Sequence, residues 1–476
     1  MTHDTPFDSL PEMSPPRSTD ARSVLDSNSE TSTLSHEALI SGPPGCTRVV
    51  VVGGGFGGMS AAKRLGNVEN VHVTIIDKRN HYLFQPLLYQ VAMSGLDPSD
   101  VAAPIRSILS KYRNINTLLA TVAGIDYDQG RILCDAGSIP FDYAIIACGA
   151  MHDYFGNDKW ENHAPGLKTI PQATEIRRRV LLAFENAERT ADPKLQSEYL
   201  TFVVVGGGPT GVELAGAIAQ MAHTTLRSDY RTVDAAQAKV LLVQSGDRIL
   251  KAFDEELSRY AIKALGELGV TVRLGDRVTD IQEHGVLIGD EFVRAKTVIW
   301  AAGVRASALG KKLGETDRVG RVIVDSDLSI PDHPNAFVVG DMASAEDESG
   351  KPYPGLAPVA MQQGRYVAEL IIAEVSGKSD PHKRERFHYF DKGHMATIGR
   401  HRAVAETGRF KLKGMIAWLG WLFIHIMYLN GFRRKFFVFL SWMISYFTYS
   451  RGARLIVRKS WQLDRPEEEL KPANES

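Results

Sequence analysis

Two glycine-rich turns of the same pattern constrain this sequence most, because each follows a run of β-branched residues. The first, Gly53-Gly54-Gly55-Phe56-Gly57-Gly58, comes directly after Arg48-Val49-Val50-Val51-Val52. The second, Gly206-Gly207-Gly208-Pro209-Thr210-Gly211, comes after Phe202-Val203-Val204-Val205. In a GxGxxG turn, the first glycine permits the turn, the second admits a pyrophosphate and the third lets helix and strand pack closely. One such turn is a weak signal, but two predict a chain that holds two dinucleotides.

Two acidic residues extend this pattern. Asp77 ends the predicted strand Val71–Ile76 and lies 24 residues after Gly53, where a carboxylate can accept hydrogen bonds from a ribose. The alternative for Asp77 is a solvated acid at a strand end. Further on, the apolar run Ala336–Val339 ends in Gly340-Asp341, which can bring a carboxylate to a ribityl chain.

Together these features resemble the two-dinucleotide flavoprotein oxidoreductases. In that superfamily FAD occupies the first site, a nicotinamide nucleotide occupies the second, and the Gly-Asp strand returns to the flavin. Ala147-Cys148-Gly149 and Ala301-Ala302-Gly303 are similar to its domain crossovers. The resemblance implies FAD contacts from Gly53, Gly55, Phe56, Gly57, Gly58, Asp77, Lys78, Gly149, Gly340 and Asp341. It implies NAD(P)H contacts from Gly206, Gly208, Pro209, Thr210, Gly211, Gln244 and Gly303.

The expected fold class is α/β, with two Rossmann-like dinucleotide-binding domains and a C-terminal membrane-associating helical segment. The FAD domain is expected to be split around the NAD(P) domain. We expect a disordered tail at 1–46, FAD-binding parts at 47–164 and 321–386, an NAD(P)H-binding domain at 165–320, and a C-terminal segment at 387–476. The tail is rich in Ser, Thr, Pro, Asp and Glu and has the features of neither a signal peptide nor a transit peptide.

Charge and cysteine content exclude several function classes. The formal net charge of −1 argues against nucleic acid as a partner. Only Cys46, Cys134 and Cys148 occur, with no CxxC or CxxxxC pair. Disulfide reductases and sulfide-oxidising quinone reductases need a thiol pair beside the flavin, because a thiolate is their reacting nucleophile. We therefore interpret Cys134 and Cys148 as inert thiols, and we expect no metal site.

The C-terminal segment combines positive charge with apolar stretches. From Lys411 to Lys459 there are nine basic residues and no acid. Between them lie Met415–Leu429 and Phe436–Tyr449, which are rich in Trp and Tyr. Basic clusters attract anionic headgroups and aromatic residues favour the interface, so we expect helices at about 411–458 to bind membrane lipid. Helices lying in the membrane plane are favoured, while a single span stays open.

Several longer strings resemble the type II NADH dehydrogenases, which are non-pumping NADH:quinone oxidoreductases. The matching strings are Val359–Ala368, Asp391–Arg400, His81–Ala92, Gly431–Arg434 and Arg451–Ile456, and the match runs from about Arg48 to Arg458. The resemblance implies a peripheral or monotopic protein on the cytoplasmic face of the inner (plasma) membrane, and a possible homodimer. It implies that NADH reduces FAD and that reduced FAD passes two electrons to a quinone without ion pumping.

The resemblance also assigns candidate catalytic residues. The family's AQxAxQ quinone pattern falls on Ala357–Gln362, where Pro358 replaces the first glutamine and only Gln362 carries over. Gln362 is expected to hydrogen-bond a quinone carbonyl, the alternative being a helix cap or turn contact. Glu213 is expected to position substrates or supply a proton, the alternative being an acid that complements the helix dipole. Lys392 matches a family Lys-Gly near the quinone, with a solvated surface role as its alternative.

A second departure from the family concerns the nicotinamide nucleotide. The predicted strand Lys239–Val243 ends at Gln244, where the family usually has an acid. A carboxylate there binds the ribose 2′-OH of NADH and repels the 2′-phosphate of NADPH, whereas a glutamine repels nothing. NADH remains the expected substrate, with NADPH use plausible and Arg248 as a phosphate partner.

Two other functions stay open from the sequence. A soluble ferredoxin or rubredoxin reductase, which uses a protein acceptor, would share both glycine turns but would not need the basic, Trp-rich tail. A flavin-binding membrane redox sensor without turnover would tolerate Pro358 and Gln244.

Overall fold

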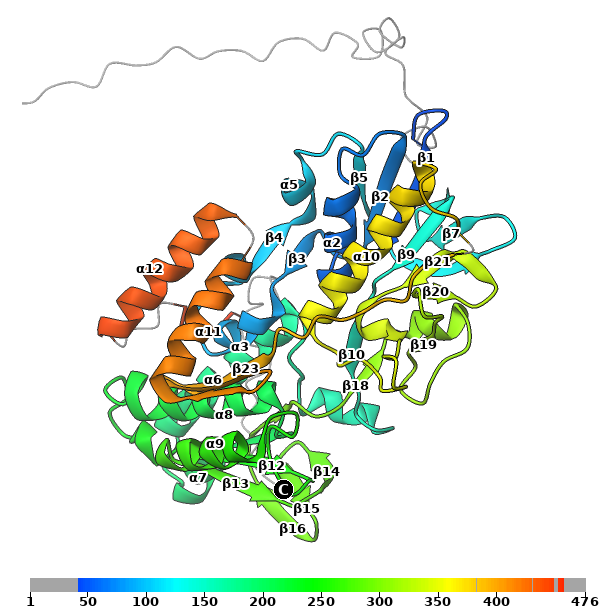
Figure 1. Ribbon diagram of the computed structural model, residues 1–476. Coiled ribbons are helices and arrows are strands. Elements are labelled where there is room, and N and C mark those ends of the chain that lie inside the picture. Colours follow the sequence, from blue (N-terminus) through cyan, green and yellow to red (C-terminus); the bar gives the residue numbers. More distant parts are fainter. Residues whose placement is uncertain (1–41, 382, 430, 449–452, 458–476) are drawn as a thin grey trace, which may run out of the picture.

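The computed structural model describes residues 42–381, 383–429, 431–448 and 453–457. The predicted tail therefore lies almost wholly outside the described residues, as does the chain from 458 onward. The described part contains two large sheets flanked by helices, one parallel and one parallel except for an antiparallel edge strand, together with a small C-terminal sheet and two C-terminal helices (Figure 1). This arrangement confirms the predicted α/β class with two Rossmann-like sheets.

The first sheet is assembled from two distant parts of the chain. Its six strands follow the order β20-β21-β9-β1-β2-β5. These strands are β1 (Thr47–Val52), β2 (Val71–Asp77), β5 (Ile115–Leu119), β9 (Tyr143–Ile146), β20 (Ser329–Ile330) and β21 (His333–Val338). Strand β21 pairs in parallel with β9 although nearly two hundred residues separate them. The residues Val49–Val52 are all buried, which explains why this run is apolar on both faces.

The second sheet repeats the plan of the first within one continuous stretch of chain. Its order is β13-β12-β11-β17, and all neighbours are parallel. These strands are β11 (Thr201–Val205), β12 (Lys239–Gln244), β13 (Val270–Leu274) and β17 (Thr297–Trp300). Each domain also carries an antiparallel three-stranded meander. The meanders are β6 (Val122–Asp126), β7 (Arg131–Cys134) and β8 (Gly137–Pro140), and β14 (Val278–Gln282), β15 (Gly285–Ile288) and β16 (Glu291–Arg294).

Helices cover both sheets, and short elements connect them. The longer helices are α2 (Phe56–Leu65), α6 (Ile170–Arg189), α7 (Pro193–Tyr199), α8 (Pro209–Gln220), α9 (Glu255–Glu267) and α10 (Ala357–Val375). The short elements are β3 (His81–Leu83), α3 (Leu88–Ala92), α4 (Pro98–Val101), β4 (Ala102–Pro104), α5 (Ile105–Leu109), β19 (Val322–Ile323) and β22 (Ala343–Ser344). Helix α10 packs tightly on α2, because a Cβ at Gly364 would lie 2.2 Å from the Gly57 carbonyl oxygen.

The two domains are joined by paired crossovers. Strand β10 (Ala150–His152) pairs antiparallel with β18 (Val304–Ala306). Each strand directly follows a glycine with positive φ, Gly149 at 67° and Gly303 at 70°. Glycine tolerates this conformation at little cost, so both predicted crossover turns form where the sequence placed them.

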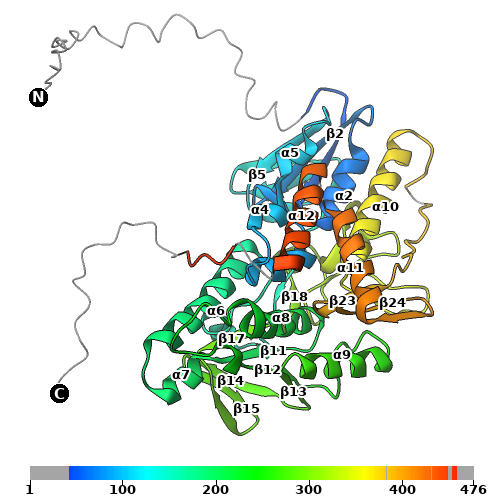
Figure 2. The same ribbon diagram turned by 90° about the vertical axis from the view of Figure 1, so that its left-hand side faces the viewer.

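Along the chain, the C-terminal segment packs first on the second domain and then on the first. Its elements are β23 (His394–Gly399), β24 (Arg402–Thr407), β25 (Phe410–Lys413), α11 (Gly414–Tyr428) and α12 (Phe432–Thr448). Strand β23 lies directly on α8, since a Cβ at Gly216 would meet the Ile398 carbonyl oxygen at 1.7 Å. Figure 2 shows α11 and α12 side by side across one face of the molecule, with α12 next to α4.

Aromatic side chains fasten these two helices to the protein. Trp421 is only 1% exposed and lies 4.2 Å from the His425 ring and 5.6 Å from the Trp442 ring, centroid to centroid. The Trp442 indole N–H donates to the Gln90 side-chain oxygen at 2.7 Å. One side of the hairpin is therefore part of the hydrophobic core.

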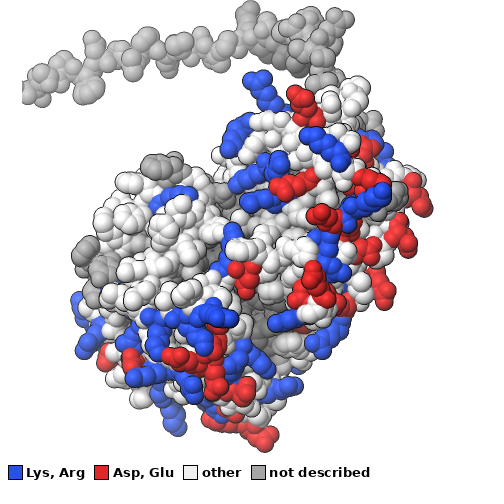
Figure 3. Space-filling view, viewed as in Figure 1, with Lys and Arg blue, Asp and Glu red and all other residues white. Residues whose placement is uncertain are grey.

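The opposite side of α11 and α12 is apolar and exposed. Its exposed side chains are Met415, Ile416, Leu419, Phe423, Ile424, Met427, Phe436, Phe437, Phe439 and Met443. The space-filling view shows a largely uncharged surface over these helices, whereas charged residues crowd the rest of that face (Figure 3). None of the described helices has both the length and the apolarity needed to cross a membrane.

The basic residues of the segment are less isolated than the sequence indicates. Lys411 and Lys413 form ion pairs with Asp254 and Glu256 at 2.6 and 2.7 Å. Arg454 forms an ion pair with Asp229. The nine basic residues of the segment are therefore not all available to anionic headgroups, because acids of the second domain neutralise at least these three.

Candidate functional site

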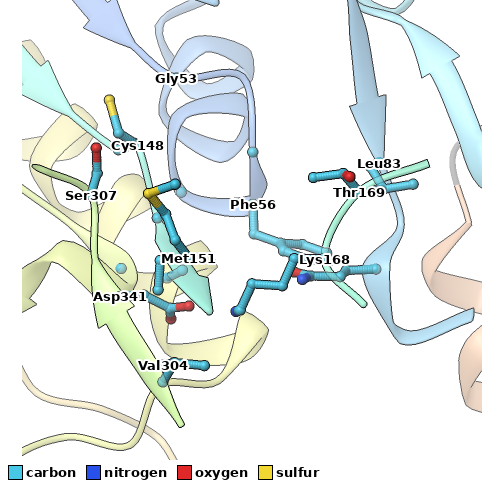
Figure 4. A pocket seen from close by; sticks show the side chains of 18 of the residues that line it. Gly53, Phe56, Leu83, Cys148, Met151, Lys168, Thr169, Val304, Ser307 and Asp341 are labelled. Atoms are coloured by element: carbon cyan, nitrogen blue, oxygen red, sulfur yellow. The ribbon is translucent and has the colours of Figure 1, made fainter. Parts of the chain in front are cut away.

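A cavity of about 870 Å³ opens where the first sheet's glycine turn faces the second domain. Its walls combine the first glycine turn, both crossovers and the Gly-Asp strand end with residues at the start of α8. Figure 4 shows part of this wall, with Gly53, Cys148 and Asp341 labelled. The predicted site residues in its lining are Gly53, Gly55, Phe56, Gly57, Asp77, Lys78, Gly149, Thr210, Glu213, Gly303, Gly340 and Asp341. The two sheets thus contribute to one shared space.

The first glycine turn is shaped as a phosphate cradle. Gly53 has φ of 104°, and a Cβ there would lie 2.4 Å from the Ala147 carbonyl oxygen. A Cβ at Gly58 would lie 1.9 Å from the Gly53 carbonyl oxygen, so only glycine fits this helix against the turn. By contrast, a Cβ at Gly55 would meet nothing within 4 Å, which leaves open space at the N-terminus of α2. Backbone N–H groups and the helix dipole favour an anion there.

The second glycine turn repeats this geometry. Gly206 has φ of 112°, a Cβ at Gly211 would lie 1.8 Å from the Gly206 carbonyl oxygen, and Gly208 faces open space. Pro209 begins α8, where its missing N–H costs nothing. Of this turn's predicted residues, Thr210 lines the shared cavity, whereas Gly206, Gly208, Pro209 and Gly211 are not part of its wall.

Asp77 and Gln244 occupy equivalent places in the two domains. An Asp77 carboxylate oxygen accepts a hydrogen bond from the Gly54 N–H at 2.6 Å, and the Gln244 side-chain oxygen accepts one from the Gly207 N–H at 2.7 Å. Glutamine therefore preserves the bond that fixes the turn. The two side chains differ in their remaining polar group. In Gln244 it is an amide NH₂, which donates hydrogen bonds, whereas in an acid it is a negatively charged oxygen, which accepts them.

Gln363 holds the Gly-Asp strand end and was missed by sequence reasoning. Its side chain is 1% exposed and accepts a hydrogen bond from the Gly340 N–H at 2.7 Å. Gly340 has φ of 73°, so this bond fixes a turn that leads directly to Asp341 in the cavity wall. Adjacent glutamines point to different sides of a helix, and the sequence alone draws attention only to Gln362.

Glu213 faces the shared cavity from the first turns of α8. Loss of hydration raises the pKa of this carboxyl from 4.5 to about 8, although a hydrogen bond from the Thr397 backbone acts in the opposite direction. At neutral pH the side chain is therefore mostly a neutral carboxylic acid, which can donate a proton.

Gln362 and Lys392 lie beyond that cavity. The Gln362 amide donates to the Phe390 carbonyl and accepts from the Phe390 N–H, both at 2.9 Å. A quinone carbonyl would have to displace one of these bonds. Lys392 donates to the Tyr428 hydroxyl at 3.3 Å and so touches the end of α11.

A second cavity of about 350 Å³ lies between α2, α10 and that end of α11. Its lining includes Phe56, Met361, Arg365 and Tyr428. Phe56 also lines the first cavity, so the two cavities have this residue in common. Met361, next to Gln362 in the chain, and Tyr428, the hydrogen-bond partner of Lys392, therefore both line this second cavity.

Of the three cysteines, all of which are described and free, only Cys148 lines the first cavity, so no pair of thiols lies there to accept electrons. Cys148 lies in the wall of the first cavity, and burial raises the pKa of its thiol to about 12. A thiol that stays protonated is a poor nucleophile. Within the described part of the chain, no group of His, Cys, Asp and Glu is arranged to hold a metal ion.

The fold and the sequence both match known proteins. Residues 47–364 match the family described as pyridine nucleotide-disulphide oxidoreductase. The chain is 44% identical over 424 residues to the type II NADH:quinone oxidoreductase Ndh of Mycobacterium tuberculosis, covering 86% of this chain and 90% of that protein. It is 30% identical to the type II NADH:quinone oxidoreductase of Staphylococcus aureus, covering 75% of this chain and 89% of that protein.

Among solved structures, NDH2 of Plasmodium falciparum in complex with NADH has the same fold. Its TM-score is 0.78 at 20% sequence identity, covering 87% of this chain and all of that one. The sulfide:quinone oxidoreductase of Aquifex aeolicus is also similar in fold, with a TM-score of 0.66 at 19% identity.

Proposed function

The chain belongs to the type II NADH:quinone oxidoreductases, within the pyridine nucleotide-disulphide oxidoreductase family, and we propose how its own residues perform that reaction. It is an FAD-dependent enzyme that oxidises NADH and reduces a quinone. The observation that carries the site assignment is the shared cavity, in which the first glycine turn and Glu213 of the second domain face the same space.

FAD fits the first glycine turn. The open space at Gly55 would take the pyrophosphate, Asp77 the adenosine ribose, and Asp341 the ribityl chain, while Gly149 and Gly340 keep the wall close to the cofactor. FAD bound there would accept a hydride from NADH and pass two electrons to the quinone, which no side chain can do. NADH would bind the second glycine turn with its nicotinamide reaching past Thr210.

Glu213 would donate a proton to the quinone as it is reduced. A quinone that receives two electrons also needs two protons to leave as a quinol. A neutral carboxylic acid at the cavity wall can donate one of them and recover it from solvent. The hydrogen bond from the Thr397 backbone would hold the carboxyl in place in both protonation states.

The second cavity would admit the quinone. It adjoins Phe56 on one side and Tyr428, at the end of the exposed apolar α11, on the other. In this arrangement Lys392 positions Tyr428, and Gln362 positions the Phe390 backbone beside the entrance.

Attachment to a membrane would follow from the exposed side of α11 and α12. We place the protein peripherally on the cytoplasmic face of the membrane, with these helices in the interface and the quinone entering from the lipid.

Removing the apolar surface is expected to release the protein from lipid. Ile416, Leu419 and Phe423 are 70%, 53% and 66% exposed, and the triple replacement by serine should weaken binding to anionic vesicles by roughly 100-fold or more. Co-sedimentation measures this, and NADH oxidation with a water-soluble quinone should persist. A matched control replaces Leu133, Leu274 and Phe292, which are exposed elsewhere. Equal release in both variants would argue against a specific membrane face.

Gln244 is expected to relax the choice of nucleotide. Its amide can donate to a 2′-phosphate, while Gln244→Glu, which has the same length, would keep the bond to the Gly207 N–H and add a repelling charge. The variant should lower kcat/KM for NADPH by roughly tenfold or more and leave that for NADH within about threefold. Steady-state kinetics with both nucleotides check this. An unchanged NADPH to NADH ratio would show that Gln244 does not face the phosphate.

The whole assignment is tested by mixing purified protein with NADH and a short-chain quinone. Quinone-dependent NADH oxidation supports it. Flavin reduction without turnover of the quinone would instead favour a protein acceptor or a sensor function.

A further inference from the structure

Lys168 enters the first cavity from the segment that joins the two domains. Its backbone is fixed, because Gly166 bridges to Trp300, the Lys168 N–H donates to the Gln172 side chain at 3.0 Å, and Thr169 caps α6. Figure 4 shows the amine end of the side chain on the side of the cavity where Asp341 and Val304 lie, away from Gly53. The position of this cation is therefore set by the fold.

The cation lacks a partner. Within the described part of the chain, the Lys168 ammonium forms no ion pair and no hydrogen bond, and only the longer-range charge of Asp341 favours it. By contrast, Lys312 at the same cavity donates to the Ala123 carbonyl at 2.9 Å. Removing an ammonium from water without a counter-charge costs free energy, so the natural occupant of this position is a negatively charged group.

FAD bound in this cavity would offer two places for negative charge, the pyrophosphate at all times and the ring system once it is reduced. The pyrophosphate already has the N-terminus of α2 and the space at Gly55, which lie on the Gly53 side of the cavity. Lys168 extends to the other side, toward the Asp341 end. We propose that Lys168 places its positive charge beside the redox-active ring system of FAD and stabilises the negative charge that the ring gains on reduction.

This inference rests on the proposed binding of FAD in this cavity. A hydride carries two electrons and one proton, so its transfer from NADH releases NAD⁺ and adds one negative charge to the neutral ring. A nearby cation makes that transfer more favourable, and its strength grows as water is excluded. When two electrons pass on to the quinone, that proton and one more from Glu213 or solvent complete the quinol, and the charge beside Lys168 disappears.

The test is the midpoint potential of the bound flavin, measured by anaerobic chemical reduction against indicator dyes without NADH or quinone. Lys168→Met should disfavour the two-electron reduction by tenfold or more, which corresponds to a potential lower by about 30 mV or more. Lys168→Arg should restore most of the difference. Lys312→Met removes an equal charge from the same cavity and should leave the potential unchanged.

Three results would overturn the proposal. One is an unchanged potential in Lys168→Met together with weaker FAD binding, which would assign Lys168 to the pyrophosphate. Another is an equal shift in Lys312→Met, which would indicate a general charge effect, and the third is no recovery with Lys168→Arg. Lys168→Gln replaces the Met variant if that protein does not fold. Failure of NADH to reduce the wild-type flavin would contradict the proposed function instead, since chemical reduction still tests Lys168.

Discussion

Glu213→Gln is expected to slow reduction of the quinone by about 10²-fold, because general acid catalysis by one side chain contributes about that much or more. Glutamine keeps the size of the side chain and can still accept the hydrogen bond from Thr397, but it cannot give up a proton. Reduction of the flavin by NADH needs no proton from the protein and should change little. Stopped-flow measurement of the two half-reactions separates these effects, and equal slowing of both would point to damaged binding rather than lost proton supply.

The same substitution should also change how the stability of the folded protein depends on pH. The pKa of Glu213 rises from 4.5 to about 8 on folding, so the folded state keeps a proton that the unfolded chain releases. Its contribution is fully present below pH 4.5 and is lost as pH rises through 8. The difference in melting temperature between Glu213→Gln and wild type should therefore shift in favour of the variant as the pH is raised from 5 to 9. In wild type the quinone half-reaction should also slow above about pH 8, and the variant should lose this dependence.

The parts of this fold that the sequence predicts well are those set by local geometry. A GxGxxG turn needs glycine because nearby carbonyl oxygens occupy the space of a Cβ, as the 1.9 and 1.8 Å approaches at Gly58 and Gly211 show. Asp77 and Gln244 are identifiable because the next parallel strand ends beside the same turn. In each case the residues that determine the structure lie within about forty positions of one another.

What the sequence leaves out depends on contacts between distant segments. Lys168 enters the cavity only because the crossover strands bring its segment against residues of both domains. The pairing of Lys411 with Asp254 joins residues 157 positions apart, so the tail's charge cannot be judged from the tail alone. The apolar stretches of the tail also have two sides, and only the structure separates Trp421 in the core from Phe423 at the surface.

The matched pair Gly58→Ala and Gly211→Ala is expected to separate the two nucleotide sites. In both variants the new methyl group would meet a backbone oxygen at under 2 Å, and neither the turn nor the helix can move away without losing its place on the sheet. Overpacking of this kind costs about 1–3 kcal/mol, which is roughly 5- to 150-fold in affinity if the bound state carries the strain.

The two variants should lose affinity for different nucleotides. Gly58→Ala should be purified with less FAD, as measured by flavin absorbance per protein, and added FAD should partly restore its activity. Gly211→Ala should retain FAD but need far more NADH to reduce it, which a reductive titration would reveal. Gly266→Ala is the control, because a Cβ on that helix meets nothing within 4 Å and alanine favours the helix. If Gly211→Ala lost FAD and Gly58→Ala kept it, the assignment of the two dinucleotides would be reversed, since each clash acts on the turn that contains it.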